Sequence, residues 1–119
     1  MDVGFIFEPN EHHVISYNKY IVKSLASVFG VSTRSSRASV ITLQKHPRLA
    51  ISFHDHTDIT SFNNAVDAIH QSRGGDSLRY LDKSLMVARD EMFNVGSSGS
   101  SKLLVIVKRY VEDRYLPFL

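Results

Sequence analysis

Two short, uninterrupted apolar runs constrain the fold of this sequence more than any other feature. The first is Val3–Phe7, which ends at Glu8, and the second is Leu103–Val107, which follows a stretch rich in glycine and serine. Such runs, without polar alternation, are typical of strands buried on both faces, as in a parallel sheet. Neither run is long enough to cross a membrane as a helix. We therefore predict an open sheet that is covered on both faces.

Helical spacing of apolar residues predicts the elements that cover this sheet. A first helix is expected to begin near Ser16 and to end before Gly30, a candidate C-cap. Its predicted apolar stripe is Tyr17, Ile21, Leu25 and Val28. A second helix is expected, with Thr60 or Ser61 near its N-cap. The apolar stripe of this second helix is Phe62, Val66 and Ile69, and that of a third helix is Leu78, Leu81, Leu85, Ala88 and Met92.

The middle of the chain predicts a hairpin. Two apolar segments, Ala38–Leu43 and Leu49–Phe53, are separated only by a short turn, so the two strands should be antiparallel. The complete order is strand, helix, strand, strand, helix, helix, strand, which indicates an open, mostly parallel α/β sheet with one antiparallel edge hairpin. Ligands of such sheets bind beyond the carboxyl ends of the central strands. Here, Glu8–His13 and Lys108–Tyr110 are expected to meet at that edge.

Composition narrows the class of protein. A chain of 119 residues, with 43% apolar and 22% charged residues, fits one globular domain. The absence of cysteine excludes a disulfide scaffold and a cysteine nucleophile. Fourteen basic against 12 acidic residues is too small a surplus to indicate a nucleic-acid partner. No signal-peptide pattern and no membrane-spanning stretch is present in the sequence.

The order and spacing of these segments resemble the von Willebrand factor type A (vWA) domain, in its extracellular-matrix branch of collagen VI and matrilin type. The resemblance runs from Asp2 to about Val107, and it begins with Asp-Val-x-Phe-Ile-Phe. It implies a doubly wound, Rossmann-like sheet and a non-enzymatic adhesion or protein-interaction module. It also implies an extracellular location as part of a larger chain, with a protein ligand of matrix or collagen type.

Members of this family carry a metal-ion-dependent adhesion site, and the resemblance implies that its remnant lies beyond the first strand. The family's Asp-x-Ser-x-Ser corresponds here to Glu8-Pro9-Asn10-Glu11-His12. Its ligating threonine falls at about Leu81, and the aspartate of its Thr-Asp-Gly motif falls on Arg109. Mg²⁺ requires near-octahedral oxygen ligands, which this set does not supply. We therefore expect a degenerate, ligand-binding site without Mg²⁺ or another cofactor, at Glu8, Asn10, His12, Leu81 and Arg109.

The resemblance also implies that the domain is incomplete. Type A domains close their sheet with two further strands and helices after the strand that corresponds to Leu103–Val107. We therefore interpret residues 1–108 as a partial vWA domain and residues 109–119 as a divergent tail. The segment Leu103–Val107 is then an edge strand whose apolar faces are only half covered, which is an aggregation hazard.

Histidines provide an alternative hypothesis, a small metal-binding protein or metal-dependent enzyme. His54 and His56 would supply zinc or copper ligands if His12 or His13 approached them. The sequence has no nucleophile elbow Gly-x-Ser-x-Gly and no phosphate-binding loop after a strand. An enzymatic activity therefore has no motif to support it.

Overall fold

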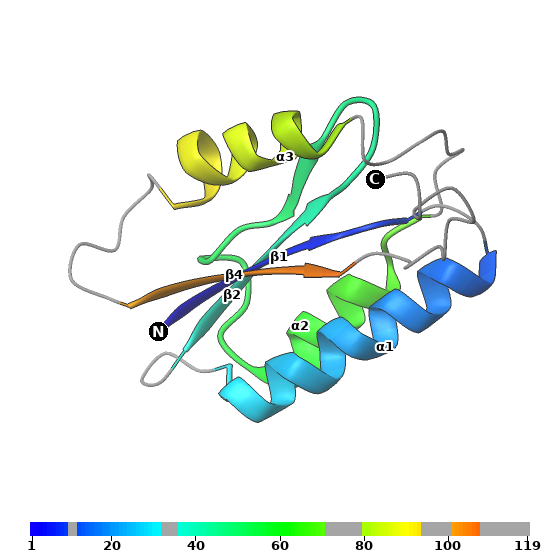
Figure 1. Cartoon of the computed structure of the whole chain (residues 1–119). Coiled ribbons are helices and arrows are strands. Elements are labelled where there is room, and N and C mark those ends of the chain that lie inside the picture. The colour runs from blue at the N-terminus through cyan, green and yellow to red at the C-terminus, as the bar shows by residue number, and fades with distance from the viewer. Residues whose placement is uncertain (10–11, 32–35, 71–79, 94–100, 108–119) are drawn as a thin grey trace, which may run out of the picture.

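A four-stranded sheet in the order β3-β2-β1-β4 forms the centre of the computed structural model (Figure 1). The central strand β1 (Asp2–Phe7) is parallel to β2 (Arg37–Thr42) and to β4 (Lys102–Val107). The short strand β3 (Arg48–Ile51) is antiparallel to β2. This arrangement confirms the predicted open α/β sheet with one antiparallel edge hairpin. The structure describes residues 1–9, 12–31, 36–70, 80–93 and 101–107.

Helices lie on both sides of the sheet (Figure 1). On one side are α1 (His12–Phe29) and α2 (Ile59–Asp67), which contact each other. On the opposite side is α3 (Leu81–Val87), which continues directly into the π-helical turn η2 (Ala88–Met92). The molecule is therefore a three-layer sandwich in which the sheet is the middle layer.

Burial of β1 on both faces explains why its sequence is a continuous apolar run. Val3, Phe5 and Phe7 belong to the apolar cluster under α1 and α2. Ile6 belongs to a second cluster, with Ala88 and Met92, on the side of α3. Alternate residues of a strand point to opposite faces, so a strand between two helix layers needs apolar residues at every position.

The buried side of α1 differs from the predicted stripe. Tyr17 and Val28 are exposed, with 66% and 80% of their surface accessible. The side chains that face the core are Ile15, Asn18, Val22 and Ala26. The prediction was wrong for Tyr17 and Val28, whereas Ile21 and Leu25 are partly buried against the core. Asn18 interrupts the buried stripe with a polar residue, while the predicted stripe is apolar throughout. The predicted C-cap is confirmed, since Gly30 has φ 74°.

The first turn of α2 is capped by Asp58 rather than by Thr60 or Ser61. Its Oδ1 accepts a hydrogen bond from the backbone N–H of Ser61 at 2.8 Å. A carboxylate in this position binds one of the N–H groups that have no partner within the helix. The pKa of Asp58 is lowered, chiefly by this backbone hydrogen bond.

This cap makes the stability of the domain dependent on pH. Because the folded-state pKa of Asp58 is lowered, its stabilising effect is present above the unfolded pKa and is lost as the pH falls through the folded value. Urea denaturation of Asp58→Ala should therefore show a lower midpoint than the unsubstituted protein at pH 7, with a smaller difference at pH 2.5. Asp58→Asn keeps an acceptor without the titrating charge, so it should retain most of the cap and lose the pH dependence. An equal deficit of Asp58→Ala at both pH values would contradict this account.

Strand β4 lies at the edge of the described sheet, as predicted for Leu103–Val107. Val107 is buried, but Leu103 and Ile106 expose 38% and 42% of their surface. The further prediction that this run is buried on both faces is therefore wrong for these two residues. Within the described ranges, β4 pairs with β1 alone, so its outer side has no neighbouring strand. None of the described helices is long and apolar enough to span a membrane.

Candidate functional site

The carboxyl ends of β1 and β4 lie side by side, which is where the sequence predicted a ligand-binding edge. Phe7 is paired with Val107 in the parallel register. The backbone N–H of Glu8 then donates a hydrogen bond to the carbonyl oxygen of Val107 at 3.1 Å. The chain leaves β1 toward β2 on one side, while β4 occupies the other side, so this edge is the topological switch point of the sheet.

Glu8 is an acidic residue in a buried position at this edge, with only 6% of its surface exposed. Its backbone is held on both sides, because its carbonyl oxygen accepts a hydrogen bond from Asn18 Nδ2 at 3.0 Å. Asn18 lies on the buried side of α1 and is itself 1% exposed. This contact fixes the start of the loop between β1 and α1, in which the predicted site lies.

Sequence reasoning missed Asn18. Its only signal was a polar residue one turn from both Ile15 and Val22, at a position where a core helix normally has an apolar residue. A buried amide requires hydrogen-bond partners, and the nearest unpaired backbone groups belong to the loop at the end of β1. Asn18 is therefore a positioning residue for this edge.

We expect Asn18→Ala to lower the free energy of unfolding by about 1–2 kcal/mol, since the Glu8 carbonyl then loses its buried donor. Amide NMR signals around Glu8 should shift, while those of β3 should not. Asn64→Ala is a matched control, because Asn64 is an exposed asparagine on α2. Equal effects of the two substitutions would contradict a specific role for Asn18.

The structure describes only some of the other predicted site residues. Leu81 is the first residue of α3, where it is partly buried against the cluster that contains Ile6. His12 begins α1 just after the loop that follows Glu8, and Asn10 and Arg109 lie outside the described residues. The structure therefore brings Glu8 and the start of α1 to the same edge.

The described residues of this edge supply few of the ligands that a magnesium ion requires. Mg²⁺ is held by carboxylate, hydroxyl, carbonyl or water oxygens in a near-octahedral array. Among the described residues predicted at this edge, Glu8 offers a carboxylate, whereas the side chain of Leu81 has no donor atom. Within the described part of the chain, no group of three or more histidine, aspartate or glutamate residues could hold a metal ion.

The four histidines of the alternative hypothesis lie at different ends of the sheet. His54 Nδ1 is 3.5 Å from Arg37 Nη1, and Arg37 begins β2 opposite Asp2. Helix α1, which begins with His12 and His13, starts instead at the carboxyl end of β1. The six residues of β1 separate these two ends by about 20 Å. The backbone at the start of α1 therefore lies at the opposite end of β1 from His54.

An open, mostly parallel sheet between two helix layers defines a doubly wound α/β domain, and Glu8 is a buried acidic residue at its switch point. A family model described as the von Willebrand factor type A domain matches residues 10–109, and the chain belongs to this family. The predicted family resemblance is thereby confirmed at this level. A comparison with curated protein sequences finds no match.

Solved structures of similar fold include proteins of the extracellular matrix and of bacterial pili. Proximal thread matrix protein 1 from the mussel byssus has a TM-score of 0.66 and 17% identity over 87% of this chain and 28% of that one. A second structure of that protein, with a zinc-occupied MIDAS motif, has the same TM-score and identity over 88% of this chain and 28% of that one. The vWF domain of the type V pili tip protein Mfa5 from Porphyromonas gingivalis has a TM-score of 0.52 and 15% identity, over 87% of this chain and 35% of that one. The chain thus spans about a third or less of these structures.

Proposed function

We propose that this chain is a vWA-type protein-interaction module that binds its ligand at the switch-point edge without a metal ion. The observation that carries this proposal is the buried Glu8, whose backbone N–H and carbonyl are both held in place. A fixed acidic residue at the carboxyl ends of parallel strands is typical of a ligand-binding position in an open α/β sheet. The proposed contact residues are Glu8, Asn10, His12, Leu81 and Arg109.

The chemistry of these residues favours direct protein contact over contact through a metal. An arginine close to a buried carboxylate forms a charge-assisted pair, and such a pair takes the place of the cation that the carboxylate would otherwise bind. Arg109 is the proposed partner of Glu8. Arginine is also enriched among the residues that contribute most to protein–protein binding.

The proposed partner is an extracellular protein of matrix or collagen type, bound by this module as part of a larger chain. Family membership supports a protein partner, since vWA domains are interaction and adhesion modules. The similarity to a byssus matrix protein and to a pilus tip protein supports an extracellular setting. These similarities concern the fold alone, so the class of partner is proposed.

Calorimetric titration with Mg²⁺, Mn²⁺ and Zn²⁺ tests the metal-independent part of the proposal. We expect no saturable binding of Mg²⁺ or Mn²⁺, because too few oxygen ligands are available. Saturable Mg²⁺ or Mn²⁺ binding would overturn the metal-independent site if Glu8→Gln abolished it. The exposed control Glu91→Gln should then retain that binding. Zinc binding that is lost in His54→Ala/His56→Ala would instead support the metal-binding alternative.

Binding to immobilised collagen tests the proposed partner. We expect surface plasmon resonance to detect binding that is the same in EDTA and in Mg²⁺. Glu8→Gln should weaken it at least about tenfold, the equivalent of one charge-assisted hydrogen bond, with a cooperative melting transition as the control for folding. Failure to bind would reject collagen as the partner, and binding only in Mg²⁺ would reject the metal-independent site.

A further inference from the structure

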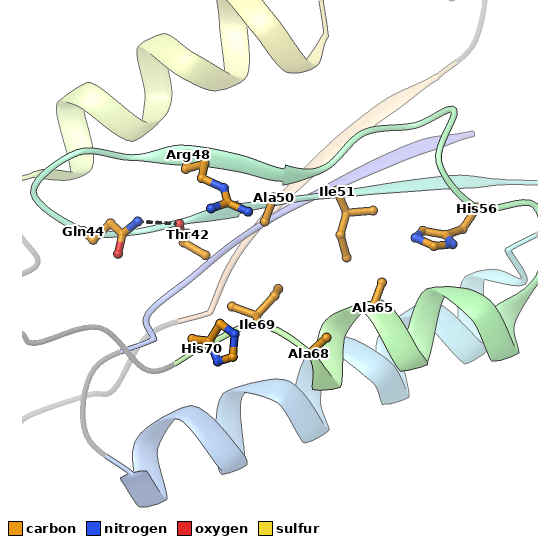
Figure 2. A pocket seen from close by; sticks show the side chains of 10 residues that line it. All are labelled: Thr42, Gln44, Arg48, Ala50, Ile51, His56, Ala65, Ala68, Ile69 and His70. Carbon is orange, nitrogen blue, oxygen red and sulfur yellow. Dashed lines mark hydrogen bonds between the residues drawn. The ribbon is translucent and has the colours of Figure 1, made fainter.

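A cavity of about 440 Å³ lies between the edge strand β3 and helix α2 (Figure 2). One of its ends is at the carboxyl end of β2, where Thr42 is in register with Phe7 of β1. Its middle is apolar, with Ala50 and Ile51 on the strand side and Ala65 and Ala68 on the helix side. The space exists because alanines occupy positions where larger side chains would close the gap between sheet and helix. A volume of this size is within the range of small-molecule sites.

One end of the cavity is polar and basic. Thr42, Gln44 and Arg48 from the hairpin, and His70 from the segment after α2, surround this end (Figure 2). Gln44 Nε2 donates a hydrogen bond to Thr42 Oγ1 at 3.0 Å, which orders the wall beside Arg48. Within the described part of the chain, the side chain of Arg48 makes no hydrogen bond and no ion pair.

No acidic residue is among the described residues that line the cavity. The carboxylate of Asp67, on the neighbouring helix, is bound by Lys23 Nζ at 2.8 Å. The carbonyl oxygens of Asp67 and Ile69 are bound by Lys19 Nζ at 2.8 and 2.6 Å. These carbonyls at the end of α2 would otherwise repel an anion, so Lys19 removes the electrostatic obstacle on this side.

The opposite end of the cavity is less suited to an anion. His56 lines it, and the carboxylate of Asp58 lies close enough to interact with this imidazole electrostatically. The charge of the cavity is therefore asymmetric, with an uncompensated guanidinium at one end and an acid near the other. Such an arrangement orients an elongated ligand that has one anionic end.

We propose that this cavity binds a carboxylate with a short aliphatic body, the carboxylate at Arg48 and the body against the alanines. A guanidinium binds a carboxylate with two parallel hydrogen bonds, and the apolar middle accommodates the methylene chain. Two sources carry this chemistry, a free aliphatic carboxylate and the glutamate side chain of a protein. The described residues that line this site differ from those proposed at the Glu8 edge, although Thr42 lies on the strand next to β1.

The test is titration of the isotope-labelled chain, followed by amide NMR signals of Ala50, Ala65 and Ile69. The probes are hexanoate, hexanol, inorganic phosphate, and a short glutamyl peptide beside its glutaminyl counterpart. Saturable shifts with hexanoate or with the glutamyl peptide support the site, and the tighter of the two identifies the source. Equal binding of hexanoate and hexanol, binding of phosphate alone, or no saturable shift with either carboxylate would overturn it.

Substitutions locate the charge that recognises the ligand. Arg48→Gln should weaken hexanoate binding at least about tenfold, since a charge-assisted pair is lost. Lys45→Gln is the matched control, because Lys45 is an exposed cation of the same hairpin that does not line the cavity. Its affinity should stay within about twofold of the unsubstituted chain. Unchanged binding by Arg48→Gln, with both variants folded, would reject the proposal.

Discussion

Arg37→Ala is expected to lower the free energy of unfolding by about 3 kcal/mol, near the lower end of the range for breaking a buried ion pair. The substitution removes the guanidinium that binds both carboxylate oxygens of Asp2, a residue that is only 1% exposed. Removing one partner of a buried ion pair costs several kilocalories per mole, because the remaining charge stays desolvated. We expect a loss near the lower end of this range because 23% of the Arg37 side-chain surface is exposed.

The geometry of this pair explains why arginine is required. Nε of Arg37 donates to Asp2 Oδ1 at 2.9 Å, and Nη2 donates to Oδ2 at 2.8 Å. The guanidinium carbon also lies 5.1 Å from the centre of the Phe53 ring. The pKa of Arg37 is raised, first by the hydrogen bonds to Asp2. Lysine supplies neither the two parallel hydrogen bonds nor the stacking surface.

Chemical denaturation of a small series measures this effect. Arg37→Lys should be intermediate, and Asp2→Asn should cost less than Arg37→Ala, because the exposed guanidinium is easily solvated. The double variant Asp2→Leu/Arg37→Leu should recover much of the stability, since a buried pair can be replaced by apolar packing. Arg89→Ala is the control, because the Arg89–Asp90 pair is exposed and should contribute little. A loss for Arg89→Ala as large as for Arg37→Ala would contradict the role of burial.

The sequence predicted most of the sheet correctly, because burial on both faces leaves a signal that does not depend on partners. Val3–Phe7 is uninterrupted for this reason, and the short turn before Arg48 required an antiparallel pair. The carboxyl-end location of Glu8 followed from the order of elements alone. These features are local in sequence or general to the class of fold.

The remaining features depend on contacts that the sequence does not display. Asn18 interrupts the buried stripe of α1, because its amide binds the Glu8 carbonyl rather than water. Asp58 caps α2 from outside the predicted first turn, a choice decided by which side chain reaches the N–H of Ser61. The cavity beside Ala50 and Ala65 required knowledge of which small residues face each other across two elements.

Gly4 and Met92 form the second pair for which we expect a large effect. Gly4 lies in the middle of the central strand, and a β-carbon at this position would meet the sulfur of Met92 and lie 3.0 Å from Cζ of Phe93. Met92 is 2% exposed, and the Phe93 ring packs against Phe53 with centroids 5.7 Å apart. The absence of a side chain at Gly4 therefore allows the π-helical turn to approach the sheet.

Gly4→Ala should lower the free energy of unfolding by about 1–3 kcal/mol, because a methyl group is added to a filled space. Met92→Ala should lower it by about 2–5 kcal/mol, because it leaves a cavity. The double variant should be more stable than the sum of the two losses predicts, by about 0.5–3 kcal/mol, since the added methyl then occupies part of the vacated space. Urea denaturation of the four proteins measures this coupling. Additive losses would show that Gly4 is required for a reason other than the approach of Met92.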